Sequence, residues 1–269
     1  MDTTLSSENR DGGTETPVSF TSASGIVTSG IFAQPALPTN RAVILCHGFL
    51  SGKNSRTNRR LTELLIPESI ATLRFDWYGM GETPESFAHL RIQNCEEQLD
   101  AAFRFLTDRA MNPIGLVGSS FGGWIAILSA SRHPELQALG LKCPVVDFPE
   151  VLRVEFGTDA MERWKRTDRI PNILGGDQLI LLPYAFFEEC LTYNSYVAAS
   201  HIRTPTLIVH GDQDEIIPSH QIDRLLTSLV GPKDLQLISG ANHYFGRPED
   251  FRLMTTHLAN WLIDRLSSS

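Results

Sequence analysis

The heptapeptide VGSSFGG at residues 117–123 decides which fold and which chemistry the sequence favours. An apolar run that starts at Ile114 precedes it and predicts a short buried strand. A second apolar run, which starts at Trp124, follows it and predicts a helix. A serine in such a strand-to-helix turn presents its hydroxyl above the edge of a sheet, beside the positive end of the helix. One of the two serines is therefore a candidate nucleophile.

The glycines around the two serines select Ser120. Strand and helix nearly collide at a sharp turn of this kind, so the residues two positions before and after the nucleophile must be small. For Ser120 these positions hold Gly118 and Gly122. For the other serine they would hold Val117 and Phe121, whose side chains are too bulky. The spacing therefore predicts that Ser120 is the nucleophile.

A base and an orienting carboxylate are needed to activate a serine hydroxyl. Of the eight histidines, His243 has the expected place, after the last predicted strand (residues 235–238) and before the closing helix. Asp214 lies a few residues beyond the predicted strand 206–210, from where its side chain can reach over the edge of the sheet. We predict that His243 is the general base and that Asp214 orients it.

Two other aspartates also follow predicted strands. Asp147 comes after the strand 139–143 and is the alternative to Asp214 as the orienting acid. Asp212 lies closer to its strand, where an aspartate typically stabilises the turn itself.

The tetrahedral intermediate of acyl transfer needs hydrogen-bond donors for its oxyanion. The backbone N–H of Phe121, the residue after the nucleophile, is one predicted donor. The second is expected in the loop after an earlier strand, and the apolar run 42–46 is followed by His47 and Gly48. Because Gly48 permits a tight turn that aims the next amide inward, we predict the backbone N–H of Phe49 as the second donor. His47 is interpreted as a residue that shapes this loop.

Predicted strands and helices alternate over most of the chain. This alternation implies parallel strands joined by crossovers, with helices on both faces of one sheet. Two β-rich runs near the N-terminus predict an antiparallel hairpin at one edge. The fold class is therefore α/β, with a mostly parallel central sheet. The predicted strands are 16–22, 26–33, 42–46, 70–75, 114–117, 139–143, 206–210 and 235–238, and the predicted helices are 57–65, 91–107, 121–131, 221–230 and 251–266.

One long interval interrupts this alternation after the strand 139–143. It is far longer than an ordinary connection, so we expect it to carry its own structure and to cover the carboxyl edge of the sheet. Its aromatic residues either form a small core of their own or wall a pocket, and Trp164 and Tyr184 are predicted to contact the substrate. The expected organisation is a disordered tail at residues 1–15, a core at 16–143 and 203–269, and an inserted lid at 144–202.

Composition and charge disfavour several classes of partner. The 269 residues carry a formal net charge of −8, which argues against nucleic acid and anionic membranes. The N-terminus lacks the apolar run of a secretory signal, and no run approaches the roughly 18 apolar residues of a membrane span. The four cysteines form no C-x-x-C pair, which favours free thiols in a reducing, cytoplasmic setting. The expected partner is a small-molecule ester, and whether the chain forms a homodimer is left open.

No metal and no cofactor are expected. The sequence has no H-E-x-x-H motif and no cluster of histidine, cysteine and acidic residues at ligand spacing. It also lacks a G-x-x-x-x-G-K-[ST] loop and the G-x-G-x-x-G spacing of a dinucleotide site. Asp76, at the end of the strand 70–75, is interpreted as organising a loop beside the oxyanion turn.

Five stretches in order, CHGFLSGK, LRFDWYGMGET, GLVGSSFGGW, LIVHGDQDEIIP and ISGANHYF, span much of the region from about residue 40 to 265. Together they resemble the α/β-hydrolase superfamily. Within it they are similar to bacterial carboxylesterases of the cinnamoyl and feruloyl esterase type and to prolyl-oligopeptidase-like serine hydrolases. The resemblance implies an α/β-hydrolase fold with a lid between the sixth and seventh predicted strands. It also implies a Ser120–His243–Asp214 triad and oxyanion donors at Phe49 and Phe121.

We therefore expect a cofactor-free serine hydrolase that cleaves a carboxylic ester through an acyl-enzyme, with an aromatic or short acyl group favoured. A thioesterase or a small aminopeptidase-like hydrolase with the same triad is the alternative. For the peptidase, Glu188 and Glu189 would hold the substrate amine. A non-catalytic binder on the same scaffold is a third class, which the complete triad disfavours.

Overall fold

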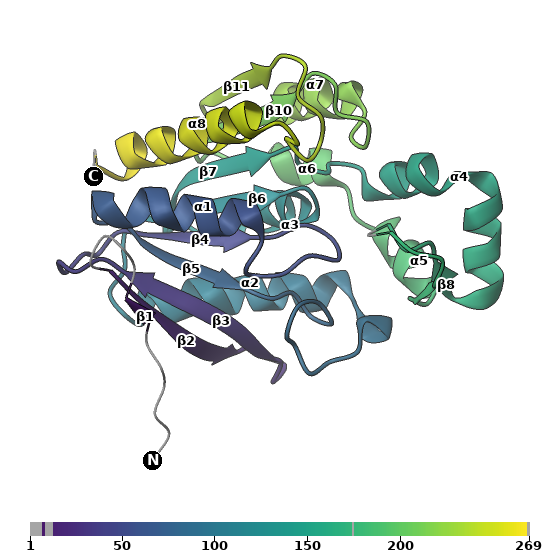
Figure 1. The fold of residues 1–269 in the computed structure, drawn as a ribbon, viewed down its shortest axis with the longest axis horizontal. Coiled ribbons are helices and arrows are strands. Elements are labelled where there is room, and N and C mark those ends of the chain that lie inside the picture. The colour runs from purple at the N-terminus through teal and green to yellow at the C-terminus, as the bar shows by residue number, and fades with distance from the viewer. Residues whose placement is uncertain (1–6, 9–12, 174, 268–269) are drawn as a thin grey trace.

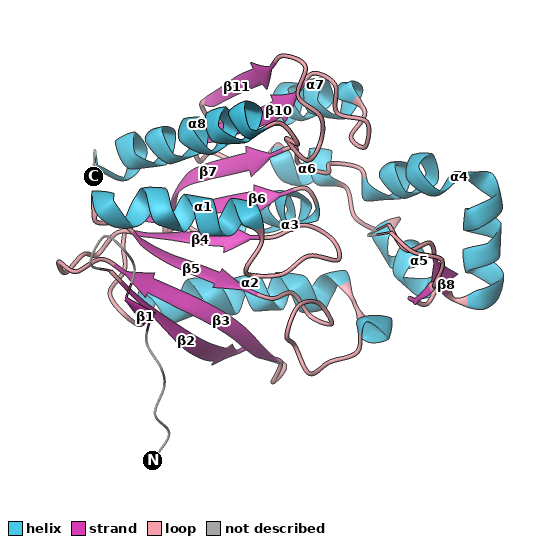
Figure 2. Ribbon diagram, viewed as in Figure 1, coloured by secondary structure: helices cyan, strands magenta, loops and turns pink. Residues whose placement is uncertain are grey.

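The computed structural model describes residues 7–8, 13–173 and 175–267, and the centre of this part is a sheet of nine strands (Figures 1 and 2). In chain order the strands are β1 (Ser7–Glu8), β2 (Thr14–Thr21), β3 (Val27–Gln34), β4 (Ala42–Cys46), β5 (Ala71–Phe75), β6 (Ile114–Ser119), β7 (Leu136–Lys142), β10 (Thr206–Gly211) and β11 (Lys233–Ile238). Their order across the sheet is β1-β2-β3-β5-β4-β6-β7-β10-β11. The six strands from β5 to β11 are parallel, so the expected α/β class with a mostly parallel sheet is confirmed.

Helices cover both faces of the sheet (Figure 1). On one face lie α1 (Arg56–Leu65) and α8 (Pro248–Ser267), and on the other lie α2 (Ile92–Thr107), α3 (Phe121–Ser129) and α7 (Ser219–Ser228). Each face has its own apolar core between sheet and helices. None of the described helices is long and apolar enough to span a bilayer. Single turns of 3₁₀ helix occur at Ile66–Glu68, Phe87–His89 and Ala130–Arg132.

The burial of these elements follows from their sequences. β4 (AVILC) has no exposed residue, the pattern of a parallel strand that helices cover on both faces. α1 is amphipathic: Leu61 and Leu65, four residues apart, are buried, and the Ser55 side chain caps its N-terminus. α3 is different, because all nine of its residues are buried. The helix that follows the turn containing Ser120 is therefore held inside the protein.

The expected N-terminal hairpin is present. β2 and β3 pair antiparallel along their whole length, and β3 pairs antiparallel with β5. Phe20 and Phe32 of the hairpin pack against Phe105 of α2, with ring centroids 5.5 and 5.6 Å from it.

The prediction of a disordered tail at residues 1–15 is wrong for those of its residues that the structure describes. Ser7–Glu8 pair antiparallel with Thr14 and Glu15, so the open edge of β2 gains backbone hydrogen bonds there. Residues 1–6 and 9–12 of the expected tail lie outside the described residues.

Between β7 and β10 the chain leaves the sheet and forms an insertion with its own helices. Figure 1 shows this insertion projecting beyond the carboxyl ends of the parallel strands. Its longest helix bends at Gly157, where φ is 69°. The elements of the insertion are α4 (Phe148–Thr167), β8 (Arg169–Ile170), β9 (Ile180–Leu181), α5 (Ala185–Cys190) and α6 (Ser195–Ala199).

Candidate active site

The turn between β6 and α3 holds Ser120 in a strained conformation. Its φ is 51° and its ψ is −115°, a combination that residues other than glycine rarely adopt. Its backbone N–H donates to the Lys142 carbonyl at 3.0 Å, and its carbonyl accepts the N–H of Trp124 at 3.1 Å. Hydrogen bonds to β7 and within α3 thus fix the sharp turn that presents the serine above the sheet edge.

The glycines around Ser120 permit the close approaches that the spacing predicts. A Cβ on Gly118 would lie 2.5 Å from the Gly122 carbonyl oxygen, so β6 and α3 could not meet as they do. A Cβ on Gly122 would lie 2.5 Å from the His47 carbonyl oxygen. The first approach is between strand and helix, as expected, whereas the second is between α3 and the loop after β4.

The structure brings Ser120, His243 and Asp214 together from three loops at the carboxyl edge of the sheet. Nε2 of His243 lies 3.2 Å from Oγ of Ser120, and Nδ1 of His243 lies 2.8 Å from Oδ2 of Asp214. The other carboxylate oxygen of Asp214 accepts the N–H groups of Ile216 and Ile217, both at 2.9 Å. With Nδ1–H donated to the carboxylate, Nε2 is the nitrogen that can accept the serine proton.

The two other aspartates have structural roles. Oδ1 of Asp147 accepts the N–H of Glu150 at 3.0 Å and so caps α4. Asp212 accepts the N–H of Gly240 at 2.6 Å, which ties the turn after β10 to the loop that carries His243. Asp147, the alternative acid, is therefore not brought to the histidine.

Burial and neighbouring charges set the protonation of this site. Burial by itself would raise the pKa of Asp214, but hydrogen bonds from His243 and from the Ile217 amide outweigh it and hold that pKa well below its usual range. Burial lowers the pKa of His243, and the cation of Lys142 lowers it further against the opposing charge of Asp214. At neutral pH the carboxylate is therefore ionised and the imidazole is neutral, as a general base requires.

The loop after β4 passes directly over Ser120. A Cβ on Gly48 would lie 3.4 Å from Cβ of Ser120 and 4.0 Å from its Oγ. Within the described residues, neither the N–H of Phe49 nor the N–H of Phe121 has a hydrogen-bond acceptor. One amide follows the glycine above the serine and the other follows the serine itself, so both are available to an oxyanion.

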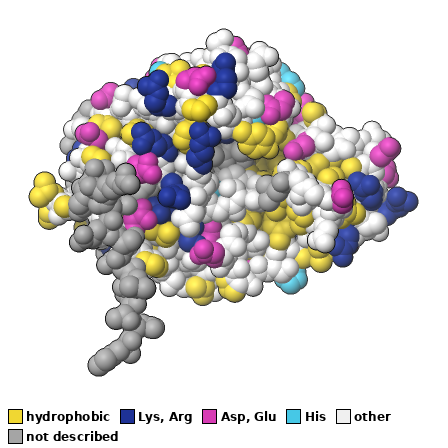
Figure 3. Space-filling model, in the orientation of Figure 1, with side chains coloured by type: hydrophobic (Ala, Val, Ile, Leu, Met, Phe, Trp, Pro, Cys, Tyr) yellow, Lys and Arg dark blue, Asp and Glu magenta, His cyan; other side chains and the backbone are white. Residues whose placement is uncertain are grey.

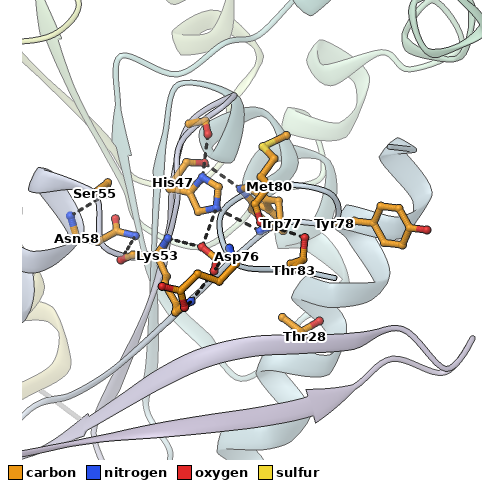
Figure 4. Close-up of polar contacts among 12 residues, drawn as sticks. Thr28, His47, Lys53, Ser55, Asn58, Asp76, Trp77, Tyr78, Met80 and Thr83 are labelled. Atoms are coloured by element: carbon orange, nitrogen blue, oxygen red, sulfur yellow. Dashed lines mark hydrogen bonds and ion pairs between the residues drawn. The ribbon is translucent and has the colours of Figure 1, made fainter. Parts of the chain in front are cut away.

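His47 holds this loop in shape, in line with its interpretation from the sequence. Its Nδ1 donates to the Gly48 carbonyl at 2.8 Å, and its Nε2 accepts the N–H of Trp77 at 3.2 Å (Figure 4). The indole N–H of Trp77 donates back to the His47 carbonyl at 2.9 Å. Burial lowers the pKa of His47 to about 4, so the ring is neutral and serves as donor and acceptor at once.

Asp76 organises the adjoining loops, also as expected. Its buried carboxylate accepts the backbone N–H of Lys53 at 2.6 Å, the Lys53 ammonium at 2.5 Å and the N–H of Glu82 at 3.0 Å (Figure 4). Gly81, with φ 62°, lies so close to the carboxylate that a Cβ would clash with it. A buried ion pair thus joins the loop after β4 to the loop after β5.

A pocket of about 250 Å³ opens above Ser120. Figure 3 shows hydrophobic side chains gathered where the insertion meets the core. Most of the surface that lines the pocket is apolar, with polar groups placed among the apolar side chains, which is typical of a small-molecule site. The apolar lining consists of Phe49, Leu50, Val145, Phe148, Val151, Ile173 and Ile216, and the polar lining includes Ser51, Ser55, Thr57, Ser119, Lys142, Glu155, His243 and Tyr244.

Trp164 and Tyr184 do not line this pocket, so the prediction that they contact the substrate is wrong. Trp164 is fully buried, and its indole N–H donates to the Leu182 carbonyl at 2.6 Å. Its ring packs edge-on against Tyr184 and Phe187, with centroids 5.4 and 5.8 Å away. These aromatic side chains form the small core of the insertion, because they join α4 to α5.

Sequence reasoning missed the pocket residues that the insertion and β7 supply. Phe148 and Val151 lie three positions apart in the first turn of α4 and so share one helix face. Lys142 is the last residue of β7 and is buried. A charged residue in an otherwise apolar strand is rare without a partner or a function, and this was the available signal.

One group of described residues, Cys143, His210 and Asp214, places three potential metal-ligand atoms within 4.8 Å of one another. Asp214 is already bonded to His243 and to two amides. Burial raises the pKa of Cys143 to about 12, so its thiol is protonated at neutral pH. Metals bind the thiolate, and this donor set therefore fits a metal poorly.

A family model described as "Alpha/beta hydrolase family" matches residues 43–252. Among curated proteins, the mitochondrial palmitoyl-protein thioesterase ABHD10 of Rattus norvegicus is 24% identical over 258 residues, covering 90% of this chain and 84% of the relative. The 2-hydroxy-6-oxo-6-(2'-aminophenyl)hexa-2,4-dienoic acid hydrolase of Metapseudomonas resinovorans is 25% identical over 264 residues, covering 86% and 87%.

Solved structures with the same fold include Est1E from Butyrivibrio proteoclasticus with bound ferulic acid. That structure has a TM-score of 0.79 and 21% identity, covering 92% of this chain and 99% of the other. Mouse alpha/beta hydrolase domain-containing protein 10 has a TM-score of 0.72 and 22% identity, covering 92% and 98%.

Proposed function

The chain belongs to the alpha/beta hydrolase family, and we propose that it is a serine hydrolase that cleaves carboxylic esters through an acyl-enzyme intermediate. One observation carries the proposal: the line of contacts from Asp214 through His243 to Ser120, at the base of an apolar pocket. Nucleophilic catalysis by serine hydrolases uses this arrangement, a serine hydroxyl, a neutral imidazole and an ionised carboxylate in this order.

In the acylation step, Oγ of Ser120 attacks the carbonyl carbon of the ester while Nε2 of His243 takes the hydroxyl proton. The ionised carboxylate of Asp214 stabilises the imidazolium that forms. The negative charge that develops on the carbonyl oxygen is stabilised by the N–H groups of Phe49 and Phe121. When the tetrahedral intermediate collapses, the bond to the leaving alcohol breaks and the imidazolium donates its proton to the departing oxygen.

In the deacylation step, water attacks the acyl-enzyme and gives its proton to Nε2 of His243. The bond from the acyl carbon to Oγ of Ser120 then breaks, and the imidazolium returns the proton to the serine. The products are the free carboxylic acid and the alcohol, and the chain needs no cofactor for any of these steps.

The pocket favours a short acyl group or one with a single ring. Its volume of about 250 Å³ is below the range of roughly 300–1,000 Å³ that is usual for drug-sized ligands. The rings of Phe49 and Phe148, which pack edge to face with centroids 5.4 Å apart, supply an apolar wall for an aromatic acyl group. The ferulic acid in the Est1E structure is consistent with this preference. We assign the wall to these residues in place of Trp164 and Tyr184.

A thioester is the second candidate substrate, because the same triad and oxyanion donors serve a thiolate leaving group. The palmitoyl-protein thioesterase relatives, which match over most of the chain, favour it. The aminopeptidase alternative has no such support. Glu188 and Glu189 do not line the pocket, and Glu189 instead accepts the N–H of Ile92 at the start of α2.

The insertion is proposed to act as the lid of this site. Its share of the pocket wall consists of Val145, Ile173 and three residues of α4, Phe148, Val151 and Glu155. A reducing compartment is also proposed, because the four cysteines are free and buried. The cytoplasm and the mitochondrial matrix both meet this condition.

The proposed function is tested by hydrolysis of matched esters, thioesters and aminoacyl arylamides, with the wild type compared with Ser120→Ala. We expect the wild type to hydrolyse the oxygen esters and the variant to lose that activity, with unchanged circular dichroism. Hydrolysis that survives in Ser120→Ala, or that occurs only with the arylamides, would refute the proposal. Turnover of thioesters far above the matched oxygen esters would select the second candidate.

A further inference from the structure

Lys142 is a buried cation without an anionic partner. Only 6% of its surface is exposed. Within the described residues, no carboxylate oxygen lies within 4.0 Å of its ammonium group. Lys53, the other buried lysine among these residues, differs because its ammonium contacts Asp76 at 2.5 Å and Glu82 at 2.6 Å. Burial of an unpaired charge is costly, so Lys142 is a residue that the fold alone does not explain.

The contacts of Lys142 leave part of its hydrogen-bonding capacity unused. An ammonium group has three N–H donors. The described residues give it one acceptor, the carbonyl of His243, and place the ring of Phe245 at 5.2 Å. The residue also lines the pocket that contains Ser120. Free N–H donors of a cation thus lie beside the site of the proposed chemistry.

Ser119 provides a second unused polar group in the same place. Its hydroxyl is buried and has no hydrogen-bond partner among the described residues, although the residue lines the pocket. Ser119 and Lys142 are register partners on the parallel strands β6 and β7. Side chains of register partners share one face of a sheet, so the hydroxyl and the lysine stem lie side by side.

We propose that Lys142 and Ser119 form a subsite for a carboxylate on the substrate, so that the preferred substrates are esters that carry a negative charge near the scissile bond. The inference rests on the proposed function, whose site it extends. The ammonium would supply the charge and the hydroxyl a further hydrogen bond, and a charge-assisted bond of this kind is stronger than a neutral one. Glu155 of α4 is the carboxylate that also lines the pocket, and it forms no ion pair with Lys142 within 4.0 Å.

The carboxylate could belong to the acyl group or to the alcohol, and two pairs of substrates separate these sources. For the acyl side, mono-4-nitrophenyl glutarate is compared with 4-nitrophenyl 5-methylhexanoate, in which an isopropyl group replaces the carboxylate. For the alcohol side, 3-acetoxybenzoate is compared with 3-isopropylphenyl acetate. Spontaneous hydrolysis is subtracted, and the measured quantity is the ratio of kcat/KM for the charged ester to kcat/KM for its neutral counterpart.

The ratio is measured for the wild type, Lys142→Met, Lys142→Arg and the control Lys233→Met, which removes a charge from an exposed lysine at the start of β11. Hydrogen bonds to charged groups contribute about 1.5–3 kcal/mol, so we expect Lys142→Met to lower the ratio about 10- to 150-fold for one of the two pairs. Lys142→Arg should restore part of it, and Lys233→Met should leave it within about threefold of the wild type.

An unchanged ratio in Lys142→Met, with both rates lowered together, would overturn the inference and leave Lys142 as a support for the His243 loop. A wild type that hydrolyses neutral esters but rejects both charged esters would overturn it while the proposed function stands. Hydrolysis that persists in Ser120→Ala would overturn both.

If Lys142→Met does not fold, a binding measurement tests the carboxylate subsite instead. Calorimetry with folded Ser120→Ala, which is expected not to cleave them, compares the intact charged and neutral esters of each pair. At least tenfold tighter binding of one charged ester than of its neutral counterpart supports the inference, and equal affinities in both pairs overturn it.

Discussion

Oδ2 of Asp214 lies 2.8 Å from Nδ1 of His243, and this contact selects the tautomer on which the proposed chemistry depends. We expect Asp214→Asn to lower kcat about 10⁴-fold, because an amide that donates to Nδ1 leaves the proton on the wrong nitrogen. The measurement is the initial rate of 4-nitrophenyl acetate hydrolysis by folded protein.

Asp147→Asn is the matched control for that variant. Asparagine is as good an N-cap as aspartate, so α4 should keep its cap and the enzyme most of its activity. A larger loss of kcat in Asp147→Asn than in Asp214→Asn would show that Asp147, and not Asp214, orients His243.

The pH dependence of the reaction follows from the lowered pKa of His243. A base with a lowered pKa loses its proton at lower pH, so kcat/KM should rise with pH along a limb centred below the ordinary value of 6.5. The charged groups that face the imidazole are Asp214, Glu215 and Lys142. A limb centred above 6.5 in the wild type would contradict the assignment of His243 as a buried base.

Lys142→Met should move the same limb to higher pH. The lysine cation opposes protonation of His243, so its removal makes the proton harder to lose. The profile is recorded with a neutral ester, so that binding of a substrate carboxylate does not contribute. A shift to lower pH would show that the lysine does not act on the imidazole through its charge.

Phe148 and Trp164 should respond differently to truncation, because one lines the pocket and the other lies in the core of the insertion. We expect Phe148→Ala to lower kcat/KM for a hydroxycinnamate ester relative to an acetyl ester. The expected loss corresponds to about 1–3 kcal/mol of activation free energy. Trp164→Ala should lower the free energy of unfolding by about 3–5 kcal/mol and affect the two esters equally. A selective loss on the aromatic ester in Trp164→Ala alone would reverse this assignment.

Asp76→Asn should mainly lower the free energy of unfolding, with a smaller effect on kcat. The substitution leaves the buried ammonium of Lys53 with only the exposed carboxylate of Glu82, and breaking a buried pair costs about 3–5 kcal/mol. Glu82→Gln is the control, since an exposed partner contributes about 0–1 kcal/mol. Urea unfolding measures the free energy of unfolding of the two variants. Equal decreases in the two would contradict the view that the buried ion pair holds these loops together.

Most of the sheet and the triad could be predicted from the sequence, because both follow from local patterns. Apolar runs between turn residues predict β4 and β6 to within a few residues, and the glycine spacing selects Ser120 without any long-range information. His243 and Asp214 were found because each follows a predicted strand, and the carboxyl ends of parallel strands meet at one edge.

The lining of the pocket could not be predicted in the same way. Trp164 was expected in the pocket because a large aromatic residue suits a wall, but its position depends on how α4 packs on α5. The pairing of Lys53 with Asp76 joins residues on different loops, and no local pattern indicates it. Lys142 did leave a signal, a charge at the end of an apolar strand, yet only the register with Ser119 places it beside the site.

The central claim is that Ser120 is a nucleophile activated by His243, and covalent labelling tests it most directly. The wild type is treated with a fluorophosphonate, digested and examined by peptide mass spectrometry, with His243→Ala and Ser120→Ala treated alike. We expect one adduct per chain, located on Ser120, that is strongly reduced in His243→Ala and absent from Ser120→Ala. An adduct on Ser119, or no adduct in folded wild-type protein, would contradict the claim.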